Sequence, residues 1–297
     1  MPDPAAAQTR HRMAARVQLA GSALCFGLMA ILARKLTQPG MGFTAGHLAV
    51  LRFVAGALVS LAVFRAVPGL YRPRNYRLLV SRGLSGGAVV VLYFYALAHM
   101  PAGEAGILYN VYPVLATVMS LAVFPERPTV HLWLAILAAS VGVVLVLGQG
   151  HGGLTLGRGA LAALAAAGFA AASANAIRAA RHTENAATIF FFFCLAGLPV
   201  VLPFALDPWP SLVHGGAWAL AVAMSLLAYG GQMLMSQAYG TLSVSEAAVW
   251  LQLLPIVQYL LAVPLLGERA TGFGLAGVLI TVAGVAYGTV FGHRKRA

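Results

Sequence analysis

Charged residues are scarce in this sequence. Asp, Glu, Lys and Arg make up only 9% of the 297 residues, whereas 60% are hydrophobic. A soluble domain carries about a quarter charged residues, so a soluble globular fold is excluded. The short alternating segments of a transmembrane barrel are also missing. Apolar runs of about 20 residues, each long enough to cross the hydrocarbon core as a helix, follow one another almost without pause. The sequence predicts an all-α membrane protein.

Cysteine and acidic residues are equally sparse. The two cysteines, Cys25 and Cys194, lie inside apolar runs with no Cys or His at ligand spacing, so we expect neither a disulfide nor a metal site between them. No Gly-rich phosphate loop and no pair of carboxylates in the middle of a run is present, which argues against an intramembrane enzyme. We therefore predict no catalytic residue, no metal and no cofactor.

The net charge of +12 is explained by membrane topology. Lys and Arg stand mostly at the ends of apolar runs, and no basic face with interleaved aromatic residues, as single-strand binding needs, is present; nucleic acid is not an expected partner. With the N-terminus inside, the cytoplasmic segments hold 14 Lys and Arg, Arg77 and Arg82 among them, and the outer segments hold four. The positive-inside rule then places both termini in the cytoplasm, as in a multi-pass protein of a bacterial inner membrane.

Ten apolar runs joined by short loops make up the chain. Residues 1–16 are expected to be a disordered basic cytoplasmic tail, and 292–297 a second basic tail. Residues 17–148 form a first five-helix repeat, 149–158 a connecting loop, and 159–291 a second five-helix repeat. The runs lie at about 17–36, 44–66, 77–99, 103–124, 130–148, 159–180, 186–206, 216–240, 244–266 and 271–291.

The two halves are related by an internal repeat. A shift of 142 positions superposes rare residues: Glu104 on Glu246, Pro113 on Pro255, and Glu126-Arg127 on Glu268-Arg269. Four of the five glutamates take part, and chance does not readily match rare charges at one spacing. Because each half has five spans, an odd number, the second half enters the membrane from the opposite side. Such inverted-topology repeats are characteristic of transporters that alternate access.

These residues resemble a known transporter group. The aromatic-rich third run, Leu92-Tyr93-Phe94-Tyr95-Ala96-Leu97, and Pro113 in the fourth run are similar to the EamA-type carriers of the drug/metabolite transporter superfamily. Leu266-Gly267-Glu268-Arg269 matches a signature of that family, whereas the first copy has Phe124-Pro125 before Glu126-Arg127. Tyr112-Pro113 is similar to the YddG-like aromatic amino-acid exporters. The resemblance implies proton- or gradient-dependent efflux of small metabolites. It also implies a central cavity lined mainly by spans 1, 3, 4, 6, 8 and 9, with spans 5 and 10 at the periphery.

Two prolines mark expected hinges. Pro113 and Pro255 lie near the middle of the fourth and ninth runs, where each removes a backbone hydrogen bond and kinks its helix. An amide precedes each proline at the same shift, Asn110 and Gln252. A buried amide is costly without a partner, so both are expected to face the bundle interior. They either bind substrate or hold neighbouring helices together.

The expected substrate site surrounds these kinks. Tyr93 and Tyr112 lie deep in their runs, and an apolar pocket with a few hydroxyls and amides suits a flat amphiphilic metabolite. Arg52, the one cation deep inside a run, snorkels, pairs with a neighbouring carbonyl, or holds a substrate carboxylate. The predicted substrate-binding residues are Tyr93, Tyr95, Asn110, Tyr112, Ser173, Asn175, Gln232, Gln237, Trp250 and Gln252.

The paired glutamates are interpreted as structural. Glu104 and Glu246 lie at helix starts, and Ser243-x-x-Glu246 is the pattern of a capping box. Glu126 and Glu268 precede the fifth and tenth runs and are expected to cap those helices. An acidic residue within the membrane is a functional candidate by default, so proton coupling through Glu104 and Glu246 is the alternative.

The predicted function is secondary transport by alternating access. The expected substrates are amino acids, including aromatic or other hydrophobic ones, moved outward. The alternative is another class of metabolite or drug, such as nucleosides or amphiphilic drugs; an intramembrane enzyme or a channel is less favoured. The expected partners are a small-molecule substrate in a central cavity, the lipid bilayer and, for coupling, protons. No obligate protein partner is predicted.

Overall fold

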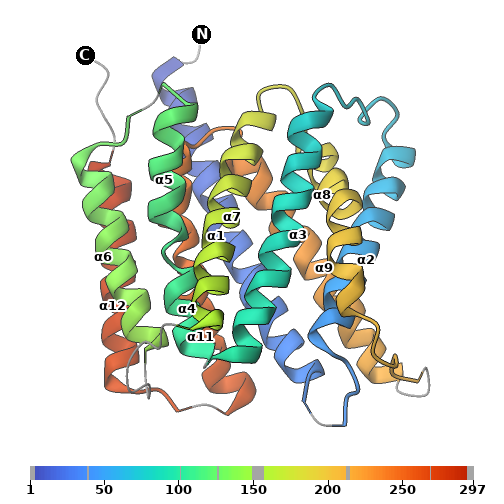
Figure 1. Ribbon diagram of the computed structural model, residues 1–297. Helices are drawn as coiled ribbons and strands as arrows, with labels where there is room; N and C mark the ends of the chain where they lie inside the picture. Colours follow the sequence, from blue (N-terminus) through green and yellow to red (C-terminus); the bar gives the residue numbers. More distant parts are fainter. Residues whose placement is uncertain are drawn as a thin grey trace.

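A computed structural model describes residues 4–38, 40–100, 102–125, 127–148, 157–211, 215–267 and 269–292. Within these ranges ten helices are long and apolar enough to cross a membrane. The predicted all-α, ten-span architecture is therefore confirmed (Figure 1). Glu126 and Glu268 lie outside the described residues, and so does the side chain of Glu104.

Twelve α-helices and one short 3-10 helix form the described chain. The first half comprises α1 (Pro4–Leu36), α2 (Ala45–Ala66), α3 (Tyr76–His99), α4 (Ala102–Tyr109), α5 (Tyr112–Val123) and α6 (Val130–Leu147). The second half comprises α7 (Arg158–Ala180), α8 (Ala186–Val201), η1 (Leu202–Phe204), α9 (Gly215–Ala238), α10 (Val244–Leu251), α11 (Leu253–Leu266) and α12 (Gly272–Phe291).

Helix starts follow from the local sequence. Thr129 and Thr271, which are 142 residues apart, precede α6 and α12, and the hydroxyl of each accepts a hydrogen bond from the backbone N–H three residues later. A threonine in this position satisfies one of the free donors of the first turn. The repeat therefore preserves the capping of the last span in each half.

The N-terminal segment differs from the prediction. Residues 4–16, expected to belong to a disordered tail, are part of α1. Two contacts explain the difference. Arg12 and Arg16 approach Glu246 at the start of α10, and Ala15 is buried in the same apolar cluster as Leu19. Order in this segment therefore comes from tertiary partners that the local sequence does not reveal.

The fourth and ninth spans are interrupted where the prolines predicted it. Helix α4 ends at Tyr109 and α5 begins at Tyr112, with Pro113 in its first turn. Helix α10 ends at Leu251 and α11 begins at Leu253. Asn110 and Gln252 occupy the two breaks, so the interruptions are placed symmetrically in the two halves.

Packing between the halves follows the repeat. Helix α3 packs on α7, and its counterpart is the packing of α9 on α1. Likewise α4 and α5 contact α7 as α10 and α11 contact α1. Each contact becomes the other when every helix is exchanged for its repeat equivalent, as an inverted repeat about a pseudo-two-fold axis requires. Helices α6 and α12 pair with each other at one edge of the bundle (Figure 1).

Glycine allows the α6–α12 pair to approach closely. A Cβ atom on Gly277 would lie 2.5 Å from the backbone oxygen of Gly142, and one on Gly284 would lie 2.9 Å from the backbone nitrogen of Ala139. The Thr281 hydroxyl donates to the Gly277 carbonyl of its own helix at 3.0 Å and also lies 3.3 Å from the Ala139 carbonyl of α6, with which it shares this hydrogen. Small residues that bring backbones together are the usual basis of helix association in lipid. Gly142 and Gly284 are repeat equivalents, so each half contributes a glycine at the same position of this close helix contact.

We expect Gly277→Val to destabilise the protein, because the added side chain would meet the Gly142 backbone and overpacking costs about 1–3 kcal/mol. Gly168→Ala in α7 is the matched control: its Cβ would meet no atom within 4 Å, and Ala is favoured over Gly inside a helix by about 0.5–1 kcal/mol. Thermal unfolding of both variants in detergent, followed by size-exclusion chromatography, measures the difference. Equal melting temperatures would contradict the packing described here.

Candidate functional site

A central cavity of about 250 Å³ lies between the two halves. Both broken helices contribute to its wall, as the family resemblance implied, together with α1, α3, α7 and α9. Helices α2 and α8 also reach it, through Arg52 and Phe193, although the resemblance did not implicate them. Its apolar lining comes from Phe26, Met29, Val89, Val90, Ala170, Ala174, Ile177, Phe193, Met235, Leu251 and Leu254.

Two arginines give the cavity its charge. Arg82 in α3 is only 3% exposed, donates from Nη2 to Oε1 of Gln232 at 3.2 Å, and places its guanidinium carbon 4.1 Å from the ring centre of Phe193. Arg52 in α2 lies with its guanidinium carbon 5.8 Å from the ring centre of Phe53. Neither arginine has an ion pair within the described chain, so the cavity wall carries two positive charges.

The position of Arg82 corrects the topology count. The count of Lys and Arg by loop placed Arg82 among the cytoplasmic charges. Helix α3 begins at Tyr76, however, so Arg82 lies nearly two turns inside the helix. Its place within the apolar run was the signal that could have revealed it. The excess of Lys and Arg on the side of the termini persists without Arg82.

Tyrosines form a polar edge on the apolar wall. Tyr112, which was predicted, lines the cavity together with Tyr109 and Tyr239. The rings of Tyr109 and Tyr112 lie 5.4 Å apart, and Tyr93 packs behind Tyr109 at 5.0 Å without lining the cavity. Tyr239 was missed by sequence reasoning because it stands at the end of its run, next to the turn at Gly240.

Three of the predicted binding residues reach the cavity: Tyr112, Ser173 and Gln232. Tyr95 does not, because it is 39% exposed on the outer surface and stacks on His99 with a ring separation of 4.0 Å. Trp250 packs into apolar clusters between helices.

The remaining amides bind other parts of the protein. Gln252 is fully buried, accepts a hydrogen bond from the Ser140 hydroxyl at 3.0 Å and donates to the Ile136 carbonyl at 3.3 Å. Asn175 donates to the carbonyl of Ala116 in α5 and to that of Ala171 in its own helix. Both amides therefore join helices. Two further amides lie away from the cavity lining: Gln237 accepts from Gln18 at 3.2 Å, and Asn110 is buried with no hydrogen-bond partner for Nδ2 among the described residues.

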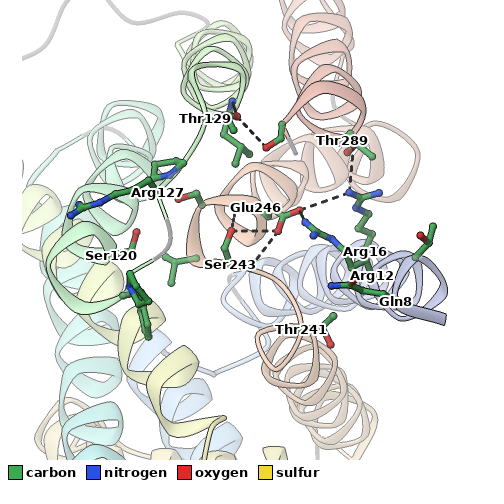
Figure 2. A pocket seen from close by; sticks show the side chains of 18 residues that line it. Gln8, Arg12, Arg16, Ser120, Arg127, Thr129, Thr241, Ser243, Glu246 and Thr289 are labelled. Atoms are coloured by element: carbon green, nitrogen blue, oxygen red, sulfur yellow. Dashed lines mark hydrogen bonds and ion pairs between the residues drawn. The ribbon is translucent and has the colours of Figure 1, made fainter. Parts of the chain in front are cut away.

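A second, larger cavity of about 750 Å³ opens at the end of the bundle that carries the termini. Figure 2 shows Arg12 and Arg16 of α1 reaching toward Glu246 at the start of α10. Arg12 Nη2 is 2.6 Å from Oε1 of Glu246, and the Arg16 guanidinium is 3.8 Å away. Glu246 also forms the predicted capping box with Ser243. This carboxylate therefore ties the N-terminal turns of α1 to the second half.

We expect Glu246→Gln to destabilise the protein by about 1.5–3 kcal/mol, the range for a hydrogen bond to a charged group. Gln can still form a capping box, so the loss should come from the ion pair. Arg12→Gln should lower the free energy of unfolding clearly less in the Glu246→Gln background than in the wild type. Ser243→Ala, which removes the cap alone, is the control. Thermal unfolding of the double-mutant cycle tests this, and additive losses from Arg12 and Glu246 would refute the coupling.

Comparisons with known proteins agree with this geometry. A solved structure described as "Crystal structure of protein" has a TM-score of 0.80 at 22% identity, covering 95% of this chain and 99% of its own; this likeness concerns the fold. The pseudopaline exporter CntI of Pseudomonas aeruginosa is 25% identical over 69% of this chain and 72% of its own length. A "Probable terminal-alkyne amino-acid exporter" of Streptantibioticus cattleyicolor is 28% identical over 77% and 79% of the two chains. A "Probable amino-acid metabolite efflux pump" of Salmonella typhimurium is 28% identical over 82% and 86%.

The sequence model of the EamA-like transporter family matches twice, at residues 15–148 and 157–289. The two matches divide the chain between α6 and α7, where the two halves of the fold also meet. Together they cover most of the sequence. The chain belongs to the EamA-like transporter family, and it is a membrane transporter and not an enzyme.

Proposed function

We propose that the protein exports small metabolites, foremost amino acids and their derivatives, from the cytoplasm of a bacterium through its inner membrane. The observation that carries the proposal is the central cavity enclosed by helices of both inverted halves. Transporters built from inverted repeats bind substrate near the membrane midplane at the repeat interface, typically beside interrupted helices. Here the breaks at Asn110 and Gln252 lie next to cavity-lining residues of α4, α5, α10 and α11.

The size of the cavity supports a small substrate. Sites for drug-sized ligands enclose about 300–1,000 Å³, whereas this cavity has about 250 Å³. An amino acid with an apolar side chain fits this volume and the largely apolar wall. Tyr109 and Tyr112 would present ring faces and hydroxyls to an aromatic or other flat substrate, which supports a relation to the YddG-like aromatic amino-acid exporters.

The relatives support the outward direction. Each of the three is named for export or efflux, and two are named for amino-acid compounds. We propose that the termini lie in the cytoplasm and that the two halves rock about the breaks near Pro113 and Pro255. The proposed energy source is the proton gradient or another solute gradient, as the family resemblance implies.

Tyr112→Ala should lower flux of an aromatic amino acid by roughly two- to tenfold, because an aromatic contact is worth about 0.5–1.5 kcal/mol and 1.4 kcal/mol corresponds to a factor of ten. Tyr95→Ala is the control, since it removes the same side chain from the outer surface. Both variants would be reconstituted into proteoliposomes and tested with a panel of radiolabelled amino acids. Saturable flux that falls with Tyr112→Ala and persists with Tyr95→Ala is expected.

Two results would count against this proposal. If no member of the panel shows saturable, protein-dependent flux, amino acids are not the substrates. If both tyrosine variants transport like the wild type, the cavity described here is not on the substrate path.

A further inference from the structure

We infer that Arg52 and Arg82 form an anion-binding pair in the central cavity, and that the transported molecule carries a carboxylate or a similar acidic group and is net negative when bound. The inference rests on the proposed function, whose substrate class it narrows. An anion with an apolar body, such as an N-acylated amino acid or an arylalkyl carboxylate, fits it better than a zwitterionic amino acid does.

The first argument is the missing counter-charge. Within the described chain the polar partner of Arg82 is the neutral amide of Gln232, at 3.2 Å, and its Nε has no hydrogen-bond partner. Arg52 has no hydrogen bond or ion pair with a described residue. Arginine is almost never buried unpaired, because its charge loses the hydration of bulk water.

The second argument is the composition of the wall. Among the residues that the structure describes, those that line the cavity include no Asp and no Glu. The aromatic rings of Phe53 and Phe193 offset part of the charge through cation–π contacts, but a ring carries no net charge. An acidic ligand would supply the missing negative charge, and the planar guanidinium matches the geometry of a carboxylate.

The third argument separates anions from zwitterions. The α-ammonium group of a free amino acid would need an acceptor in the same small space and would be repelled by both guanidinium groups. The wall offers tyrosine hydroxyls, Ser173 and Gln258 as neutral acceptors, while the Gln232 oxygen already accepts from Arg82. A molecule whose nitrogen is acylated avoids this repulsion. Its apolar part would contact the hydrophobic lining of α1, α3, α7 and α10.

The inference is tested first by binding, with three probes that share one apolar body. N-acetylphenylalanine is an anion, phenylalanine a zwitterion and phenylalaninamide a cation. Thermal stabilisation of the full-length protein in detergent gives the affinity for each. The anion should bind at least tenfold more tightly than the cation, with the zwitterion between them. Equal stabilisation by the cation, or no stabilisation by the anion, would overturn the inference.

Substitutions test whether the two arginines are responsible. Arg52→Gln and Arg82→Gln should each weaken binding of N-acetylphenylalanine at least tenfold, whereas Arg82→Lys, which keeps the charge, should lose less. Arg65→Gln is the matched control, because Arg65 is an exposed arginine on the same helix as Arg52. Elution profiles in detergent establish that each variant is folded. Unchanged binding by both folded glutamine variants would contradict the inference. Chloride that stabilises the wild type as strongly as N-acetylphenylalanine at equal concentration would also contradict it.

Flux in proteoliposomes separates this inference from the proposed function. Binding of the anion that depends on Arg52 and Arg82, with no flux of any probe, would sustain the anion site and count against transport through it. Saturable flux of phenylalanine that both glutamine variants retain, with no preference for the anion, would sustain transport and overturn the anion site.

Discussion

The burial of unpaired positive charge on the cavity wall is the physical constraint on which the site depends. A guanidinium group in a protein interior loses much of its hydration, and the loss is repaid only by well-placed partners. Gln232 and the ring of Phe193 supply part of this stabilisation for Arg82. The arginines and their partners belong to α2, α3, α8 and α9, which all contribute to the cavity wall. The same polar contacts that make the burial tolerable also orient the cation toward the cavity.

The charge also breaks the symmetry of the repeat. At the shift of 142 positions, Arg82 corresponds to Met224. The second spans match at a shift of 140, which superposes Leu58 on Leu198 and Phe64 on Phe204, and there Arg52 corresponds to Phe192. Both arginines thus come from the first half, while Gln232 and Phe193 come from the second. In transporters built from inverted repeats, the repeat makes two helix arrangements of nearly equal energy possible, which alternating access needs. The two arginines of the cavity wall, in contrast, are residues that the two copies do not share.

The architecture could be predicted because it depends on features that are local or periodic. Apolar runs of membrane length gave the ten spans, and the matched spacing of Pro113 and Pro255 gave both interruptions. Three of ten predicted binding residues, Tyr112, Ser173 and Gln232, line the cavity. The face of a helix that points inward depends on the neighbouring helices, and a helix that is apolar on every face gives little indication of it in its sequence. For this reason the sequence did not predict that Tyr95 lies on the outer surface or that Gln252 forms hydrogen bonds with α6.

Charged residues misled the sequence reading for a related reason. Arg82 was counted as a loop charge because the positive-inside rule assigns cations by their distance from the end of a span. A cation inside a span is instead stabilised by polar partners within the protein, as Arg82 is by Gln232. Of the four glutamates that revealed the repeat, Glu246 is the one whose surroundings are described. It does not line the central cavity but caps α10 and pairs with Arg12 and Arg16. The residues that best reveal ancestry and those that bind substrate need not coincide.

The two helix breaks are equivalent in sequence but not in their contacts. Gln252 is fastened to α6 by two hydrogen bonds, to Ser140 and Ile136, whereas the Nδ2 group of Asn110 has no partner among the described residues. A buried amide hydrogen that lacks an acceptor costs about 1–3 kcal/mol. Within the described residues, side-chain hydrogen bonds therefore join the α10–α11 break to α6, whereas Nδ2 of the equivalent amide in the α4–α5 break forms none. Positions that are equivalent in the repeat thus have different polar surroundings in this conformation.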